Sequence, residues 1–381
     1  MNNNYQIMCK ITEYYFEKIV DISTFKNGSF CLLYPDQLVY YSNEYIILSD
    51  IPLDYTPTNL LTLTIKSKLF AVARTKKSLY LYSLEDNVFI YKTRVDLKDD
   101  ITYWTKTKDN QILICSKNKI SFYEIKNNFF LKTQNDLIIN EETFIENSQY
   151  FKTNKEIQEK DFYLNNLLIL KIFELENDYI IVIKKELYKI EDITETCDCP
   201  QCCTYICDQT SFILLSIIKL NKKEQKLKNI YEIEFQIKFT NNYNWKTVYQ
   251  RRESKNQLYY FDNTLINSIE ILENKLLLYF PEQKNIEKID INSSEQKYKS
   301  VLYNPGENLE SYKIIFLSEN CFYICQYKYD RYSDFVKKDI TFINNNKEED
   351  DPYYDIILIK KINPLLFVFE YDTLTISKKI F

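Results

Sequence analysis

The chain has 381 residues, of which 45% are hydrophobic and 16% aromatic, and its 49 basic and 54 acidic side chains give a net charge of −5. It contains no histidine, which excludes Ser-His-Asp triads, Cys-His pairs and imidazole-ligated metal sites. With only two glycines, Gly28 and Gly306, it can form neither a P-loop nor a dinucleotide-binding fingerprint. We attribute the composition mainly to an A/T-rich genome, because Asn, Lys, Ile, Tyr and Phe dominate it.

The first residues, Met1 to Gln6, show no basic segment followed by an apolar run, so we expect no secretory signal. No stretch approaches 18 consecutive apolar residues, and we therefore expect no membrane insertion. These features predict an intracellular protein, cytoplasmic or nuclear, whose 10 cysteines are mainly reduced.

Internal repetition is the main structural signal of the sequence. Residues 69–90 align without a gap on residues 110–131, and the same shift of about 41 residues places Phe30–Leu32 on Ala71–Ala73. Each unit contains four short runs rich in β-forming residues, separated by polar turns, and is therefore expected to form four strands. We expect Asn and Asp to occupy the left-handed turn positions that glycine takes in other proteins.

Seven such units can be recognised, and they begin near Lys18, Asn59, Ile101, Leu168, Thr264, Tyr312 and Tyr354. Four-stranded units at this spacing resemble the blades of the β-propeller superfamily, in its degenerate WD40-like form, although no Gly-His or Trp-Asp pair is present. The resemblance implies an all-β fold with one domain over residues 1–381 and seven four-stranded blades, or eight.

Three segments depart from the repeat. Gln6–Ile11 precedes the first unit and is expected to supply the fourth strand of the last unit, which joins the two ends of the chain and removes a sheet edge. The polar stretch 138–163 is predicted to be an inter-blade loop. The stretch 194–262 is an insertion or an irregular eighth blade, with strand-like runs at Phe212–Ile218 and Tyr231–Ile237.

A cysteine-rich loop is the sharpest local motif. Within the stretch 194–262, a C-x-x-C turn is formed by Cys199 and Cys202, and Cys197 and Cys207 could complete a four-thiolate zinc site, with Cys203 as the competing ligand. A single structural zinc ion is therefore one interpretation. The alternatives are a disulfide or redox pair and an ordinary cysteine-rich surface loop. Elsewhere, Cys31 and Cys115 fall on predicted inner strands and are expected to be core residues.

A basic and aromatic cluster follows, formed by Trp245, Tyr249, Arg251, Arg252 and Tyr259. Tyr, Trp and Arg concentrate at protein interfaces, so these residues are candidate contacts with other protein subunits. The same combination also suits nucleic acid, which the acidic net charge makes the less favoured partner.

The sequence contains no recognisable catalytic set. By analogy with the fold, the chain is expected to be a non-enzymatic protein-interaction scaffold, a subunit of a multi-protein assembly. Two alternatives remain open. One is a carboxylate-based hydrolase in the propeller channel, which predicts clustered acids with raised pKa. The other is an RNA-binding propeller that uses residues 245–259.

Overall fold

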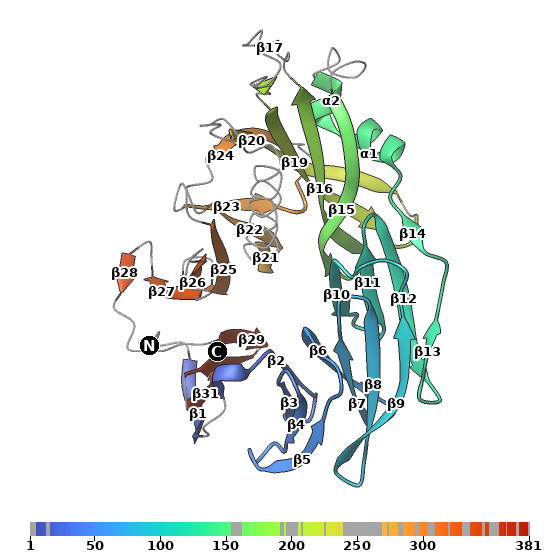
Figure 1. The fold of residues 1–381 in the computed structure, drawn as a ribbon, viewed down its shortest axis with the longest axis vertical. Coiled ribbons are helices and arrows are strands. Elements are labelled where there is room, and N and C mark those ends of the chain that lie inside the picture. Colours follow the sequence, from blue (N-terminus) through green and yellow to red (C-terminus); the bar gives the residue numbers. More distant parts are fainter. Residues whose placement is uncertain are drawn as a thin grey trace. The chain divides into compact units, whose positions relative to one another are not determined.

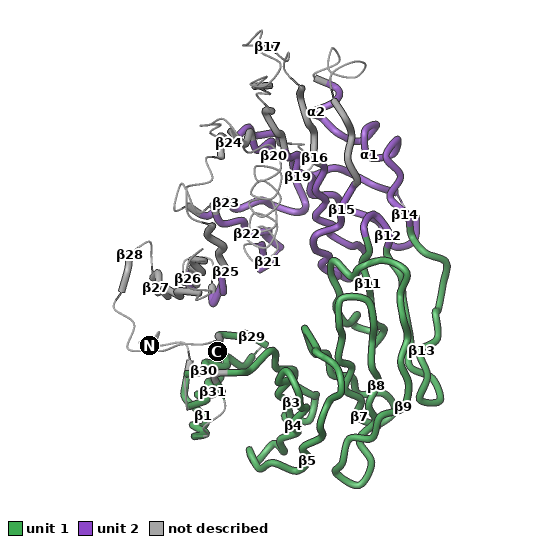
Figure 2. The backbone as a smooth tube through the Cα atoms, in the orientation of Figure 1, with its two compact units in different colours: residues 1–116, 120–137, 348–381 green, residues 117–119, 138–347 purple. Residues whose placement is uncertain are grey.

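A computed structural model gives the fold of the chain, which consists almost wholly of β-strands in the described residues (Figure 1). The described residues are 5–12, 16–153, 162–190, 194–195, 205–206, 209–224, 226–238, 269–272, 274–280, 285–293, 297–303, 309–318, 321–329, 336–344, 347–349, 358–362, 364–370 and 373–379. The chain divides into two compact units (Figure 2). Unit 1 comprises residues 1–116, 120–137 and 348–381, and unit 2 comprises residues 117–119 and 138–347.

Unit 1 contains four antiparallel sheets, and the first three have four strands each. The sheet that contains both chain ends has the strand order β1 (Tyr5–Thr12), β31 (Thr373–Lys379), β30 (Leu365–Phe369) and β29 (Leu358–Ile362). A 3-10 turn, η1 (Phe16–Lys18), leads to β2 (Asp21–Thr24), β3 (Phe30–Leu33), β4 (Gln37–Tyr41) and β5 (Ile47–Pro52). The next sheet contains β6 (Asn59–Ile65), β7 (Lys68–Arg74), β8 (Ser78–Glu85) and β9 (Val88–Asp96).

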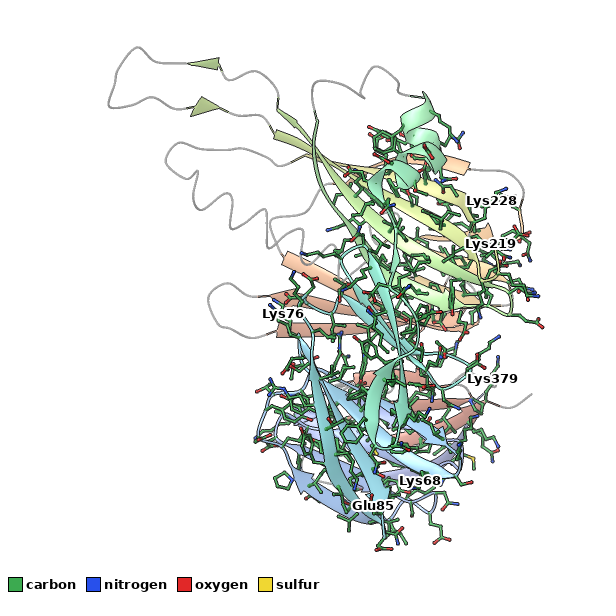
Figure 3. All side chains as sticks on the ribbon, turned by 90° about the vertical axis from the view of Figure 1, so that its right-hand side faces the viewer. Lys68, Lys76, Glu85, Lys219, Lys228 and Lys379 are labelled. Carbon is green, nitrogen blue, oxygen red and sulfur yellow. The ribbon has the colours of Figure 1, made fainter. Side chains whose placement is uncertain are left out.

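The fourth sheet of unit 1 contains β10 (Tyr103–Lys106), β11 (Ile112–Ser116), β12 (Lys119–Lys126) and β13 (Phe129–Lys132), and the short β14 (Leu137–Ile138) pairs with β12. In the β2–β5, β6–β9 and β10–β13 sheets the strands follow the chain order, as the repeat predicted. Figure 3 shows how this order separates two ends of unit 1: Lys76, in the turn between β7 and β8, lies at one end, and Glu85, at the turn before β9, lies at the other.

Neighbouring sheets of unit 1 pack face to face through buried apolar clusters. Ile22, Phe30 and Tyr41 pack with Phe367 and Ile376, which joins the sheet of the chain ends to the β2–β5 sheet. Equivalent clusters join the β2–β5 sheet to the β6–β9 sheet, and that sheet to the β10–β13 sheet. The β2–β5 and β6–β9 sheets each bury both faces against neighbouring sheets of unit 1, which explains why their inner strands are apolar at successive positions. Cys31 and Cys115 are fully buried, as predicted.

The turns show how the chain manages with two glycines. Positive φ angles occur at Asp86, Asn87, Asn127 and Asn128, between the third and fourth strands of two sheets. Two consecutive residues of positive φ define the type I′ hairpin turn, which matches the twist of the flanking strands. The prediction that Asn and Asp take these positions is confirmed there. The turn between β6 and β7 instead uses Lys66 and Ser67, which lack this preference.

Unit 2 has one large sheet and two smaller ones. The large sheet contains β15 (Phe162–Glu174), β16 (Asp178–Ile190), β19 (Gln209–Asn221), β20 (Leu227–Lys238) and β24 (Lys297–Tyr303), the last parallel to β20. The others contain β21 (Ile269–Leu272), β22 (Lys275–Phe280) and β23 (Asn285–Asp290), and β25 (Leu309–Ser318), β26 (Cys321–Tyr329), β27 (Val336–Asn344) and β28 (Lys347–Glu349). A two-stranded ribbon joins β17 (Thr194–Glu195) to β18 (Tyr205–Ile206).

The predicted insertion 194–262 is partly ordinary sheet. Its strand-like runs 212–218 and 231–237 lie in β19 and β20, which pair with each other and continue the sheet begun by β15 and β16. These two strands therefore extend the sheet begun by β15 and β16, while the choice between an insertion and an irregular eighth blade for 194–262 stays a prediction. Long-range pairing of β16 with β19 places the cysteine-rich stretch between two neighbouring strands of one sheet.

The stretch 138–163, predicted as a loop, contains two short helices, α1 (Glu141–Asn147) and α2 (Gln149–Thr153). Both contact β20. Phe144, Tyr150 and Phe151 are buried, so the helices are held by packing against the sheet and not by their short, polar sequence. No helix among the described residues is long and apolar enough to cross a membrane.

Strand β1 occupies the position predicted from the sequence. Residues Tyr5 to Thr12 pair antiparallel with Lys379 to Thr373, with one register shift near Met8. The sheet of the chain ends therefore has four strands although its own C-terminal segment supplies only three. The predicted closure is confirmed.

Candidate functional site

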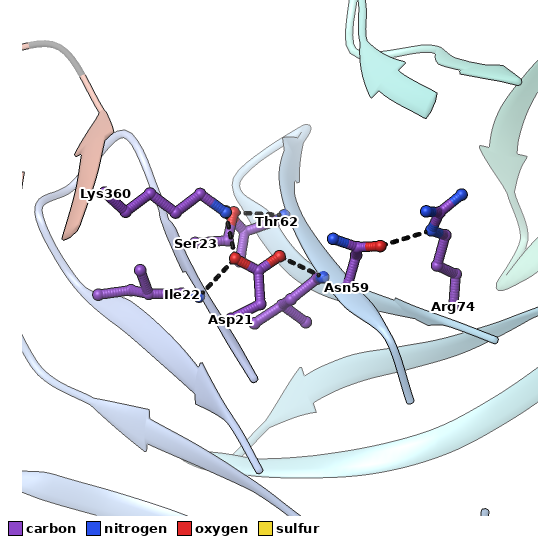
Figure 4. Close-up of polar contacts among 8 residues, drawn as sticks. Asp21, Ile22, Ser23, Asn59, Thr62, Arg74 and Lys360 are labelled. Carbon is purple, nitrogen blue, oxygen red and sulfur yellow. Dashed lines mark hydrogen bonds and ion pairs between the residues drawn. The ribbon is translucent and has the colours of Figure 1, made fainter. Parts of the chain in front are cut away.

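Three sheets of unit 1 meet at the carboxylate of Asp21, the first residue of β2 (Figure 4). Asp21 is 6% exposed. One carboxylate oxygen accepts the N–H of Ile22 at 2.9 Å, and the other accepts the N–H of Leu60, at the start of β6, at 2.9 Å. Lys360 of β29 donates to the same carboxylate. A single buried charge is thus compensated by a cation from the last sheet and by a backbone donor from the second repeat.

Hydroxyl groups continue this contact between β2 and β6. The Ser23 and Thr62 hydroxyl oxygens lie 2.9 Å apart, and Thr62 donates to the carbonyl of Thr24 at 2.6 Å. The N–H of Thr62 donates to the Ser23 hydroxyl at 3.1 Å. Because these groups are buried, each bond compensates the loss of water and fixes one sheet against the next.

Arg74, the last residue of β7, extends the polar site toward the following sheet. Its Nε donates to the Asn59 side-chain oxygen at 2.8 Å, and one terminal nitrogen lies 3.4 Å from the carbonyl of Ile101. Its guanidinium carbon lies 5.5 Å from the centroid of the Trp104 ring, a cation–π distance. Burial lowers the pKa of Arg74 to about 10, partly offset by the charge of Asp21. Asp21, Asn59 and Arg74 were not singled out in the sequence.

We expect Asp21→Ala to lower the free energy of unfolding by about 3–5 kcal/mol, because it leaves the Lys360 cation and the Leu60 N–H without their acceptor. Lys360→Met should cost less, because the carboxylate keeps its hydrogen bonds from the N–H groups of Ile22 and Leu60. Urea denaturation of both variants measures the difference. Equal, small losses would show that the carboxylate is not the centre of this contact.

The predicted zinc ligands lie outside the described residues: Cys197, Cys199, Cys202, Cys203 and Cys207. The ribbon beside them is described, and it pairs Thr194 with Ile206 and Glu195 with Tyr205. It therefore holds together the two ends of the segment 196–204. Among the described residues, no group of His, Cys, Asp or Glu side chains could hold a metal ion. Zinc binding stays a prediction.

Protein purified without added zinc is expected to contain about one equivalent of zinc if four thiolates form a closed tetrahedral site. Cys199→Ser should remove that metal, while Cys31→Ser, in the core of unit 1, should leave the stoichiometry unchanged. Elemental analysis measures both. Wild-type protein with less than roughly a tenth of an equivalent would reject the site.

The predicted interface residues Trp245, Tyr249, Arg251, Arg252 and Tyr259 also lie outside the described residues. A different exposed set is visible in unit 1, on or directly before the outermost strands β5, β9 and β13. These are the outer-strand apolar residues: Ile46, Ile47, Leu48, Val88, Ile90, Tyr91, Phe129 and Leu131. Strands β5 and β13 both contact β9, so the three strands are neighbours.

The exposure of these side chains is large. Ile46 is 56% exposed, Tyr91 52% and Phe129 61%, whereas Phe89 on the inner face of β9 is 2% exposed. None of these residues was singled out from the sequence as part of a surface. The sequence did contain a signal for this surface, since Val88–Tyr91 carries apolar side chains on both faces of the fourth strand of its unit.

Buried acids and phenols mark unit 2. Glu232 is 1% exposed and accepts the Tyr150 N–H at 2.8 Å and the Ser216 hydroxyl at 3.2 Å. Lys185 is fully buried and pairs with Glu141 of α1. These bonds attach α1 and α2 to the large sheet. No observation in the described part of the chain favours the hydrolase or the RNA-binding alternative.

Several phenols have raised pKa values. Burial raises the pKa of Tyr82 to about 12, although the hydrogen bond with the Tyr55 hydroxyl, 2.8 Å away, lowers it. Burial and the charge of Glu234 raise the pKa of Tyr150 to about 12. Burial, together with a hydrogen bond to the Glu287 carboxylate, raises the pKa of Tyr231 further. Burial lowers the pKa of Lys185, opposed by Glu141.

Among known proteins, similarity is found only with solved structures and at low identity. Comparison with protein-family models finds no match, and comparison with curated proteins finds none. The chain is similar to the Dos1 propeller (9% identity, TM-score 0.41, 98% of this chain and 94% of that one). It is also similar to Kluyveromyces lactis Hsv2 (10% identity, TM-score 0.33, 87% of this chain and 99% of that one). A third similar structure is the extracellular domain of the putative hybrid two-component system BT3049 from B. thetaiotaomicron (11% identity, TM-score 0.38, 98% of this chain and 41% of that one).

The sheets themselves define the class of protein. Six have four or five strands, mostly in chain order, and a seventh, formed by β21, β22 and β23, has three among the described residues. The chain is an all-β protein of the β-propeller class, and the predicted fold class is confirmed. The predicted number of seven blades stays a prediction.

Proposed function

We propose that the chain is a non-enzymatic protein-interaction module, a subunit that supports the assembly of other proteins. The observation that carries the proposal is the set of outer-strand apolar residues in unit 1. Eight of the twelve large apolar side chains that are exposed among the described residues belong to this set. Apolar side chains gathered on a surface mark interaction sites in soluble proteins.

The position of these residues suits a protein partner. Strands β5, β9 and β13 are each the last strand of their sheet, so their outer backbone groups have no neighbouring strand in that sheet. A partner can therefore combine apolar contacts with backbone hydrogen bonds. The turn residues Glu44, Glu85 and Lys126 lie beside the apolar side chains and supply a charged rim, as in many protein interfaces.

The test is co-purification of partners with tagged protein from the native source, quantified by mass spectrometry. The double variant Ile90→Glu/Phe129→Glu changes two exposed side chains and should leave the fold intact. A loss of about tenfold or more in specific partners is expected, because charges would replace desolvated apolar contacts. The matched control is Ile138→Glu, which changes a side chain that is 56% exposed outside this set. Equal recovery with both variants would contradict the proposal.

A further inference from the structure

Arg74 and Arg94 of unit 1 form a natural comparison. Each guanidinium lies over an aromatic ring, Arg74 at 5.5 Å from Trp104 and Arg94 at 5.4 Å from Tyr80. Each Nε donates to a side-chain oxygen, at 2.8 Å for Arg74 and 2.7 Å for Arg94. The acceptor of Arg94 is the carboxylate of Asp96, whereas the acceptor of Arg74 is the neutral amide of Asn59.

This difference leaves Arg74 without a directly bonded carboxylate, although the more distant charge of Asp21 partly offsets its burial. Among the described residues its guanidinium has two hydrogen-bond acceptors, Asn59 and Ile101, and no ion pair with a carboxylate. A guanidinium has five N–H donors, so three of them find no acceptor there. Arg94 is exposed and can rely on water, but Arg74 is half-buried, and burial lowers its pKa while Asp96 raises the pKa of Arg94. Withdrawing a cation from water without a counter-charge is unfavourable.

The surroundings of Arg74 add further positive charge. Lys76 and Lys77 follow it at the same end of unit 1 and share the carboxylate of Asp100, at 2.8 and 3.5 Å. Asp21 is already paired with Lys360.

We propose that Arg74 is an oxyanion-binding residue that takes a carboxylate or phosphate group on its free N–H donors, with the ring of Trp104 and the amide of Asn59 holding the guanidinium in place. The planar fork of Arg matches the two oxygens of such a group, and a pre-positioned fork loses little entropy on binding. The site lies apart from the outer-strand apolar residues, and the inference stands independently of the protein-interaction proposal.

The test uses the full chain with Trp245→Phe, which makes Trp104 the only tryptophan. Sodium glutarate and inorganic phosphate are titrated separately by calorimetry, with ionic strength held constant by sodium chloride. Trp104 fluorescence is followed in parallel, because charge neutralisation beside the ring alters its emission. We expect a saturable signal from at least one anion. Glutarate alone, or phosphate alone, would identify the source of the oxyanion as a carboxylate or a phosphate group.

Two variants locate the binding. Arg74→Met should abolish the signal, and Asn59→Asp should weaken it at least tenfold by supplying an internal carboxylate, with no loss of the cation. If Arg74→Met does not fold, Asn59→Asp still tests the proposal. Arg94→Met is the matched control and should bind normally. Absence of a saturable signal with both anions, or binding that Asn59→Asp leaves unchanged, would overturn the proposal.

Discussion

Deletion of residues 1–12 is expected to lower the free energy of unfolding by about 5 kcal/mol and the melting temperature by roughly 10 °C. The deletion removes the whole of β1 and with it seven paired positions along β31. It also uncovers Leu374 and Ile376, which are fully buried and pack in the cluster between the first two sheets of unit 1. The loss therefore combines backbone hydrogen bonds with apolar burial.

The control is deletion of residues 1–4, which precede β1 and should leave the melting curve unchanged. A synthetic peptide of residues 1–12, added to the shortened protein, should restore part of the lost stability, because an isolated strand can add to a free sheet edge. Differential scanning calorimetry measures all three. An unchanged melting temperature in the protein without residues 1–12 would mean that β1 does not complete this sheet.

A cooperative alkaline unfolding transition between pH 10 and pH 12 is the second large effect. Tyr82, Tyr150 and Tyr231 are 2–4% exposed, and their pKa values are raised above the value of about 10 for an unfolded chain. Their contribution is fully present below pH 10 and is lost as the pH rises, because the unfolded state releases these protons first. In this range each of these tyrosines lowers the free energy of unfolding by about 1.4 kcal/mol per pH unit, and the three together lower it by about 4 kcal/mol per pH unit.

Over two pH units this loss is comparable with the whole stability of a typical domain. Arg74, Lys106 and Lys185 act in the opposite direction over part of this range, since their lowered pKa values make stability rise with pH. The raised pKa values of Tyr55, Tyr103 and Tyr298 add to the loss. Urea denaturation at a series of pH values, with phenolate absorbance, measures the slope. Tyr231→Phe should reduce the slope by about 1.4 kcal/mol per pH unit. The exposed Tyr91→Phe is the control. A flat stability profile up to pH 12 would refute this account of the buried phenols.

The repeat in the sequence predicted the fold because sheet structure is largely local. Residues 69–90 and 110–131 carry their strand and turn pattern within a few neighbours, so β7–β9 and β11–β13 followed directly from it. Even the distant pairing of β1 with β31 was predicted, because the last unit lacked one strand. Local patterns did not predict contacts between residues that lie far apart in the sequence and that the repeat does not relate.

The helices α1 and α2 and the Asp21 contact illustrate that failure. Phe144 of α1 and Tyr150 of α2 are buried because both helices pack against β20, which lies far along the chain. The sequence also does not mark the beginning of α1, since Asn140 makes no side-chain cap. Asp21 meets Leu60 and Lys360, and no spacing rule relates the three positions. The outer-strand apolar residues were missed for another reason: the apolar residues on both faces of the fourth strand of a unit were not read as a surface.

The pairing of β1 with β31 has a consequence for the growing chain. During synthesis β1 is complete long before Thr373–Lys379 exists, so its hydrogen-bonding edge stays without this partner until that strand is made. A waiting strand can pair wrongly with another chain. The exposed Lys10 and the register shift near Met8 make β1 a poor partner for itself, since charge and irregularity discourage edge-to-edge association. This sheet can therefore be completed only when β31 has been made and pairs with the much earlier β1.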